Sequence, residues 1–394
     1  MKVAIFTDND FDKLNGLTAS LRAAVRYAPD GISPRIYTAS DLPDGLPNYF
    51  AVGSLGLPVP FCGDMQMYVP RPRRFLKEVL DDGVGVIHFT TPGPVGLAGL
   101  FVAWRTRLRT VGSVHVDLAA CATRLSGSPT LGAVMGEYVR WAYAKCDRVL
   151  VPSESTRQLL IGGRFAPQNV DLWTRGVDTE LFNPAKRSAA VRERWRVDDR
   201  RPAIMYVGRI SPEKGLGDIR RIQSALHRRG VEHRLVFVGE GPLREELQAA
   251  LPDAVFTGAL PPSEVAVALA SADLFLLPSD TDADGSAVLE AQASGVPAIV
   301  SSFGGPKEYI RAGITGAVCP GGDLDAFGHE AAVLVRDTRR RLEMNRAARE
   351  HALTLRWERV LEPLYRAYRE VAARGRGRLH RVPLAASARG NATA

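Results

Sequence analysis

The feature of the sequence that most constrains the fold is an alternation of short, mainly apolar runs with longer amphipathic stretches. Runs such as Val3–Phe6 and Arg148–Val151 have the length and composition of strands that are buried on both faces. After the first run, Leu17, Leu21 and Val25 recur at helical spacing. Strands that alternate with helices predict a parallel sheet covered by helices, which is an α/β fold.

The same pattern restarts after Pro202. Two further strand-like runs follow, and they end at Gly208 and Gly239. A chain of 394 residues is also too long for one ordinary core. We therefore expect two doubly wound, Rossmann-like domains, over residues 1–185 and 200–360, that face a cleft. Ligands of such sheets bind beyond the carboxyl ends of the strands.

Three other segments complete the predicted organisation. The charged stretch Arg192–Arg201 is interpreted as part of a linker between the two domains. A last helix is expected over residues 357–373, and its apolar face is expected to pack back on the N-terminal domain. Residues 374–394 combine Arg-Gly steps with small residues, so this basic tail is predicted to be disordered.

The charge of the chain is mildly basic, with 51 Lys and Arg against 43 Asp and Glu, a net charge of +8. Local concentrations lie at residues 71–74 and 105–109 and in the tail. Solvated surface arginine is the simpler interpretation, and an anionic membrane surface is the alternative. No long Lys-rich run is present, and no nucleic-acid partner is expected.

Cysteine usage and the N-terminus indicate the compartment. The cysteines are far apart and have no CxxC or Cys/His spacing, so neither a zinc site nor a disulfide framework is expected. The first apolar run is too short for a signal peptide, and no window is apolar for long enough to span a membrane. We expect a cytoplasmic protein, whose alternative location is peripheral, on the inner face of the membrane.

Two basic residues follow the first strand of the second half. Arg209 comes directly after Gly208, and Lys214 lies a few residues later, at a helix start. Two positive charges on one loop can hold a diphosphate and stabilise it as it departs. Ordinary surface charge is the competing interpretation of each residue taken alone.

The segment from Asp282 to Glu290 supplies the complementary chemistry. It places a helix start at four residues whose backbone N–H groups and helix dipole favour a phosphate: Gly285, Ser286, Ala287 and Val288. Just inside this helix, Glu290 can accept hydrogen bonds from both hydroxyls of a ribose. Asp282, before the helix, can accept one from a sugar hydroxyl.

A metal site is the alternative interpretation of the acidic residues at 280–284. Alternating acids can bind Mg²⁺ or Mn²⁺. Because Arg209 and Lys214 already supply a countercharge, we expect neither a metal ion nor another cofactor.

These motifs resemble glycosyltransferase family 4, whose members are retaining enzymes with the GT-B fold. The resemblance spans roughly residues 1–370. The matching segments are Gly208-Arg209…Lys214-Gly215, Asp282…Glu290, Ser294-Gly295-Val296-Pro297, Asn15-Gly16, His115-Val116-Asp117 and Arg175-Gly176-Val177-Asp178. The resemblance implies that the backbone of Gly16 approaches the donor phosphate and that His115 hydrogen-bonds the donor sugar.

One position departs from the family pattern. The family usually carries Glu where this chain has Asp282. The side chain of aspartate is shorter by one C–C bond, about 1.5 Å. The resemblance therefore leaves open which sugar is moved.

The expected activity is that of a hexosyltransferase that moves a sugar from a UDP- or GDP-sugar, with retention, to a hydroxyl of a lipid, glycan or small molecule. His115, Arg209, Lys214 and Asp282 are the expected catalytic residues. The alternatives are a sugar phosphorylase of the same fold and a non-catalytic sugar-nucleotide-binding subunit. A nucleotide-binding oxidoreductase is disfavoured, because no GxGxxG follows the first strand.

Overall fold

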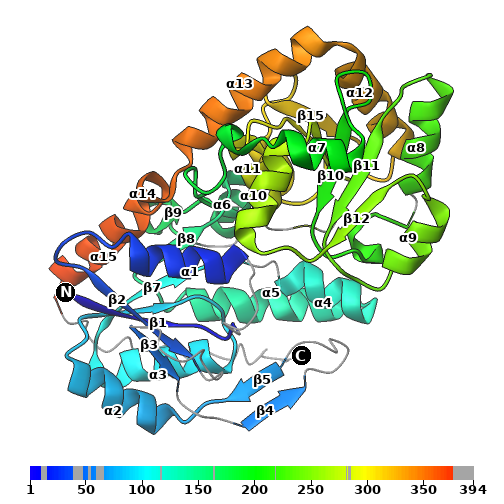
Figure 1. The fold of residues 1–394 in the computed structure, drawn as a ribbon. Helices are drawn as coiled ribbons and strands as arrows, with labels where there is room; N and C mark the ends of the chain where they lie inside the picture. The colour runs from blue at the N-terminus through cyan, green and yellow to red at the C-terminus, as the bar shows by residue number, and fades with distance from the viewer. Residues whose placement is uncertain are drawn as a thin grey trace, which may run out of the picture.

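The structure is a computed structural model. It consists of two α/β halves, each built on a parallel sheet (Figure 1). Asn15, Val116, Asp117, Asp284 and most of the basic tail lie outside the described residues. The structure describes residues 1–9, 16–38, 48–51, 55–58, 66–115, 118–162, 165–217, 219–280, 282 and 285–375.

The core of the first half is a seven-stranded sheet. Its strands are β1 (Lys2–Phe6), β2 (Ser33–Thr38), β3 (Tyr49–Ala51), β6 (Val86–Phe89), β7 (Arg109–Ser113), β8 (Arg148–Val151) and β9 (Val170–Leu172). Their order in space is β3-β2-β1-β6-β7-β8-β9, and all neighbouring pairs are parallel. The predicted run Val3–Phe6 is fully buried in the central strand β1, which explains its continuous apolar character.

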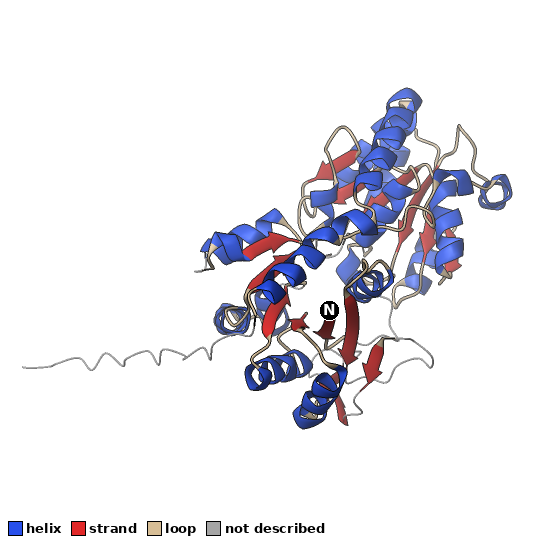
Figure 2. Cartoon of the chain, turned by 90° about the vertical axis from the view of Figure 1, so that its left-hand side faces the viewer, coloured by secondary structure: helices blue, strands red, loops and turns tan. Residues whose placement is uncertain are grey.

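Helices cover both faces of this sheet (Figure 2). One face is packed by α1 (Gly16–Arg26) and α15 (Glu362–Ala373). The other is packed by α2 (Pro72–Asp82), α3 (Pro94–Thr106), α5 (Pro129–Tyr143) and α6 (Glu154–Gly162). The remaining elements are the antiparallel strands β4 (Leu55–Pro58) and β5 (Gln66–Val69), helix α4 (Leu118–Ser126) beside α5, and the 3-10 turn η1 (Pro167–Asn169).

The second half contains a six-stranded parallel sheet in which the strands, from one edge to the other, are β12 (Val255–Gly258), β11 (Arg234–Val238), β10 (Ala203–Val207), β13 (Leu274–Leu277), β14 (Ala298–Ser301) and β15 (Gly316–Cys319). Its helices are α8 (Ile219–Arg228), α9 (Arg244–Ala250), α10 (Pro262–Ser271), α11 (Ser286–Ala293), α12 (Leu324–Arg336) and α13 (Thr338–Thr354), and its 3-10 turns are η3 (Pro212–Lys214) and η4 (Pro306–Tyr309).

Both sheets are doubly wound. The strand order reverses between β1 and β6 in the first sheet and between β10 and β13 in the second. In open parallel sheets, ligands bind outside the carboxyl ends of the strands at such a reversal. The loops that follow β1, β6, β10 and β13 are therefore the ones that the topology marks for a site.

The segment that joins the two predicted domains and leads into the charged stretch is structured. It contains the 3-10 turn η2 (Pro184–Lys186) and helix α7 (Ala189–Trp195), and Trp195 is buried in the core of the second half. Arg187 and Arg192 donate to the carboxylate of Asp273 at 2.7 and 2.8 Å. These ion pairs and the burial of Trp195 hold the segment against the second half, beside α10.

After α13, the chain crosses back to the first half through α14 (Trp357–Val360) and α15 (Figure 1). The apolar face of α15 joins the core of the first sheet, and the hydroxyl of Tyr365 donates to the carbonyl of Ala24 at 3.0 Å. This second crossing lies beside the first, because the backbone N–H of Val177 donates to the carbonyl of Leu355 at 3.0 Å. No helix within the described ranges is long and apolar enough to cross a membrane.

Candidate active site

The loops at the carboxyl edge of the second sheet pack backbone against backbone. Gly208 and Gly239 have φ values of 146° and 140°, and a Cβ on Gly239 would lie 2.0 Å from the carbonyl oxygen of Gly208. A Cβ on Gly215 would lie 2.5 Å from the carbonyl oxygen of Pro278. Glycine at these positions thus lets the loop after β10 contact the loops after β11 and β13.

This packing brings Lys214 and Asp282 together. The ammonium Nζ of Lys214 donates to Oδ2 of Asp282 at 2.8 Å, and the two side chains are 26% and 15% exposed. The pair is charge-assisted and largely shielded from water, which strengthens the hydrogen bond. Oδ1 of Asp282 also accepts the backbone N–H of Gly285 at 3.4 Å, so the carboxylate lies at the start of α11.

Gly285 sets the geometry of that helix start. Its φ of 68° is left-handed, and a Cβ there would lie 2.7 Å from the ring of Tyr309. The backbone N–H of Val288, which the sequence assigned to a phosphate, donates to the carbonyl of Gly285 at 3.1 Å. The first turn is tight, so the amides nearest to the helix terminus are those of Ser286 and Ala287.

The two other predicted donor residues lie on the same edge. Arg209 is exposed on the loop that carries Lys214, and its carbonyl accepts the hydroxyl of Tyr206 at 2.7 Å. Glu290 is half-buried on α11. In the part of the chain that the structure describes, no three His, Cys, Asp or Glu side chains form a group that could hold a metal ion.

In the first half, His115 lies just beyond the end of β7 and closes a chain of hydrogen bonds. Its Nε2 lies 2.7 Å from Oγ of Ser113, which lies 2.8 Å from Nε2 of His88. Nδ1 of His88 lies 2.7 Å from the hydroxyl of Tyr368, on α15. The chain therefore connects the C-terminal helix to His115 through the core of the first half.

The direction of these hydrogen bonds follows from counting protons. Among the described residues, Nδ1 of His88 is the hydrogen-bond partner of the Tyr368 hydroxyl. If Tyr368 donates, His88 donates through Nε2–H to Ser113, and Ser113 donates to Nε2 of His115. The opposite direction leaves the proton of Tyr368 without an acceptor. The satisfied arrangement therefore leaves the proton of His115 on Nδ1.

Both histidines are neutral in this network. Burial lowers the pKa of His88 to about 3. Burial also lowers the pKa of His115 well below its ordinary value, and the positive charge of Arg175 lowers it further. A neutral imidazole can donate a hydrogen bond without acting as a proton source at ordinary pH.

Gly16 and Arg175 meet at the start of α1. Nη1 of Arg175 donates to the carbonyl of Gly16 at 2.6 Å and to the hydroxyl of Ser20 at 2.7 Å. Arg175 is only 7% exposed, so it fixes the first turn of the helix from inside. The sequence matched the segment of Arg175 to the family but did not predict this contact, which joins residues distant in the sequence.

Ser113 and Thr90 lie at or just beyond the ends of neighbouring strands, but neither side chain reaches the surface of the site. Both side chains are fully buried, and Ser113 lies between the two histidines.

Asp8, just beyond β1, is a further half-buried carboxylate that was not predicted for the site. Its carboxylate accepts the backbone N–H of Val95 at 2.7 Å and that of Gly96 at 3.2 Å. Burial raises the pKa of Asp8, although these hydrogen bonds oppose the shift. Its signal in the sequence was a carboxylate directly after a buried strand.

Comparisons with known proteins agree with this fold. The model of Glycosyltransferase Family 4 matches residues 18–181, and that of Glycosyl transferases group 1 matches residues 188–351. A GDP-mannose-dependent alpha-mannosyltransferase from Corynebacterium glutamicum is 31% identical over 392 residues, which cover 98% of this chain and 91% of that protein. A sulfoquinovosyl transferase from Arabidopsis thaliana is 29% identical over 369 residues, which cover 90% of this chain and 71% of that protein.

The solved structure of HepE from Anabaena in complex with UDP superposes with a TM-score of 0.74 at 16% identity, and it covers 94% of this chain and 100% of its own. The fold is therefore the GT-B fold, and the protein is a nucleotide-sugar glycosyltransferase. The chain belongs to glycosyltransferase family 4.

Proposed function

We propose that this enzyme transfers mannose from GDP-mannose to a hydroxyl acceptor with retention of the anomeric configuration. The observation that carries the proposal is the contact of Lys214 with Asp282 at the start of α11. In this contact, the ammonium of Lys214, which can bind a diphosphate, lies beside the carboxylate of Asp282, which can bind a sugar hydroxyl. The choice of GDP-mannose among UDP- and GDP-sugars is supported by the donor named for the Corynebacterium glutamicum relative.

The diphosphate binds to Lys214 and Arg209 and to the amides of Ser286 and Ala287, where the helix dipole favours negative charge. Glu290 accepts the hydroxyls of the ribose. Asp282 accepts a hydroxyl of the mannose through one oxygen while Lys214 holds the other. These contacts fix the bond between the anomeric carbon and the phosphate oxygen in place for reaction.

The transfer needs no protein nucleophile. As the bond between the anomeric carbon and the phosphate oxygen breaks, the diphosphate keeps the electron pair, and the sugar becomes oxocarbenium-like. The acceptor oxygen bonds to the anomeric carbon on the face that the diphosphate leaves, and its proton passes to a phosphate oxygen. Lys214 and Arg209 stabilise the negative charge that develops on the leaving group. The neutral Nδ1–H of His115 donates a hydrogen bond to the donor sugar.

We propose that the two basic residues replace a metal ion in neutralising the leaving group. Dialysis of the enzyme against EDTA should leave its turnover unchanged. Loss of turnover that Mn²⁺ restores would overturn this part of the proposal.

For the acceptor, we propose a lipid hydroxyl at the inner, cytoplasmic face of the membrane, where the enzyme binds peripherally. The basic residues exposed on α2 and α3 support a negatively charged surface as the partner. A glycan or a small-molecule hydroxyl is the competing acceptor.

A donor panel tests the proposed function. Purified enzyme is supplied with GDP-mannose, UDP-glucose or mannose 1-phosphate, together with lipid extract, and nucleotide or phosphate release is measured. We expect release from GDP-mannose and an α-linked product, identified by the one-bond carbon–hydrogen coupling constant at its anomeric carbon. Preference for UDP-glucose would contradict the donor, a β-linked product would contradict retention, and turnover of mannose 1-phosphate alone would indicate a phosphorylase.

A further inference from the structure

Helices α3 and α5 expose both of the accessible tryptophans of the chain. Trp104 on α3 is 57% exposed and Trp141 on α5 is 52% exposed, whereas the other three tryptophans are at most 9% exposed. The two helices follow the neighbouring strands β6 and β7 and pack on the same face of the sheet. The hydroxyl of Tyr138 on α5 also donates to the carbonyl of Pro92, just before α3.

Each exposed indole has a cation over its ring. The guanidinium carbon of Arg105 lies 5.8 Å from the ring centroid of Trp104, and Nζ of Lys145 lies 5.6 Å from that of Trp141. Further large apolar side chains are exposed on the same helices. Together these residues form what we call the tryptophan face: Phe101, Trp104 and Arg105 of α3, with Leu131, Val134, Trp141 and Lys145 of α5 and its C-terminal end.

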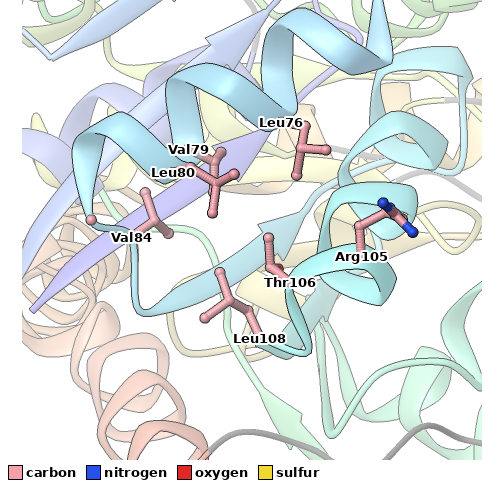
Figure 3. A pocket seen from close by; sticks show the side chains of 8 residues that line it. Leu76, Val79, Leu80, Val84, Arg105, Thr106 and Leu108 are labelled. Atoms are coloured by element: carbon pink, nitrogen blue, oxygen red, sulfur yellow. The ribbon is translucent and has the colours of Figure 1, made fainter.

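The tryptophan face continues into an apolar groove between α3 and α2. The groove has a volume of about 330 Å³, and Leu76, Leu80 and Leu108 line it. Figure 3 shows these apolar side chains gathered between the two helices, with Arg105 at one end. Leu80 is 60% exposed, so the apolar surface of α3 continues onto α2.

The charges around this surface are mainly positive. On α2, Arg73, Arg74 and Lys77 are exposed. The carboxylate of Glu137 on α5 forms an ion pair with Arg140, and Glu78 and Asp81 are further acidic residues of α2. Tryptophan with neighbouring Arg and Lys is typical of surfaces at the interface of a bilayer, where the ring lies at the headgroup level and the cation meets lipid phosphate.

We propose that the tryptophan face docks the enzyme onto an anionic phospholipid bilayer. The indoles of Trp104 and Trp141 insert at the headgroup level, and Arg105 and Lys145 bind lipid phosphates. Leu131 lies near the start of α5 and Trp141 near its end, so α5 lies in the plane of the membrane. Helices α3 and α5 start at the carboxyl edge of the sheet, and His115 lies at the same edge. In this orientation the membrane surface therefore extends towards His115. The inference deepens the proposed function by naming how a lipid acceptor is reached.

Vesicle flotation tests the proposal. Wild-type enzyme is mixed with vesicles of phosphatidylglycerol and phosphatidylcholine, or of phosphatidylcholine alone, at low and high salt. We expect flotation with the anionic vesicles at low salt, less at high salt, and a blue shift of tryptophan fluorescence. The double variant Trp104→Ser/Trp141→Ser should bind these vesicles about tenfold more weakly. A Leu342→Ser variant is the matched control, because Leu342 is 49% exposed on α13, in the second half.

Nucleotide release from GDP-mannose with a water-soluble hydroxyl acceptor separates docking from catalysis and also reports folding. A double variant that keeps this release but loses vesicle binding supports the docking surface. A wild type that releases nucleotide but does not bind anionic vesicles overturns the docking surface alone. Equal vesicle binding by the wild type and the double variant also overturns it. So does a wild-type dimer that the double variant dissociates in analytical ultracentrifugation, since a second copy would then cover the face.

Discussion

The ammonium of Lys214 lies 2.8 Å from the carboxylate of Asp282, across 68 residues of sequence. The cation proposed for the leaving group and the carboxylate proposed for the sugar are thus one hydrogen-bonded unit. Any motion that moves the ammonium of Lys214 therefore also moves the carboxylate proposed for the sugar.

The first prediction concerns this pair. Lys214→Ala should lower kcat/KM for the nucleotide-sugar about 100-fold, since it removes the cation proposed for the leaving group and breaks the ion pair between Lys214 and Asp282. Asp282→Asn should cost less, and the double variant should lose less than the product of the two single losses. Lys307→Ala is the control, because Lys307 is an exposed lysine that bonds a carbonyl. Strictly multiplicative losses would show that the two side chains act separately.

The second prediction concerns the identity of the residue at position 282. Asp282→Glu should change the ratio of kcat/KM for GDP-mannose to that for UDP-glucose by about tenfold, because its longer side chain shifts the oxygen that meets the sugar hydroxyl. Steady-state assays with both donors measure the ratio. An equal loss for both donors would mean that the residue positions Lys214 and does not select the sugar.

The third prediction concerns the start of α11. Gly285→Ala should destabilise the protein by about 1–3 kcal/mol, because a Cβ meets both a left-handed φ and the ring of Tyr309. Gly313→Ala is the matched control: its φ is 79°, and nothing lies within 4 Å of its Cβ position. Chemical denaturation compares the two variants. A similar loss in both would assign the cost to the backbone alone, without a contribution from Tyr309.

The fourth prediction concerns the hydrogen-bond chain. Tyr368→Phe should lower kcat about tenfold with little change in KM, because the proton on His115 is then no longer held at Nδ1. The ¹⁵N chemical shifts of His115 report the tautomer directly. Tyr365→Phe, on the same helix, is the control variant. It removes a buried hydrogen bond to the carbonyl of Ala24, which is not part of the hydrogen-bond chain that ends at His115. If both variants behave alike, Tyr368 has only a structural role.

The fifth prediction concerns acid stability. His88 has a pKa of about 3 in the folded protein and about 6.5 when unfolded. Between these values the unfolded state binds more protons than the folded state. The contribution of His88 to stability is therefore fully present above pH 6.5 and is lost as the pH falls towards 3. The slope is about 1.4 kcal/mol per pH unit.

Denaturation of the wild type and of His88→Gln between pH 4 and 6 measures this slope. The variant should lose less stability per pH unit, whatever its stability at neutral pH. Burial also lowers the pKa of His115, so part of the slope remains in the variant. Parallel curves for the two proteins would contradict a neutral, buried His88.

The sequence predicted the strands well because burial on both faces leaves a continuous apolar run. The run Arg148–Val151 was predicted with the same bounds that the structure shows for β8. It also placed Lys214 and Asp282 on loops of the same edge, since both follow strands of one parallel sheet.

What the sequence could not supply depends on contacts between distant residues. Helix α7 was interpreted as a linker because the carboxylate that binds Arg187 and Arg192 belongs to Asp273, much later in the chain. The series of hydrogen bonds from Tyr368 to His115 joins strands of the first sheet to a helix from the C-terminal end of the sequence. In the tight first turn of α11, the amide of Val288 donates to the carbonyl of Gly285. Sequence patterns predict where a helix starts but not which of its first amides are hydrogen-bonded within the turn.

The return of the last helix to the first half limits how the two halves can move. The polypeptide passes between them twice, near Val177 and near Leu355, and a backbone hydrogen bond joins the two passages. The guanidinium of Arg349 adds hydrogen bonds to the carbonyls of Phe182 at 2.8 Å and Ala293 at 2.6 Å. Two neighbouring connections define a hinge axis, so the halves can rock open and shut about that line but resist sliding. Deleting α15 would remove the anchor of the second passage together with part of the core of the first half.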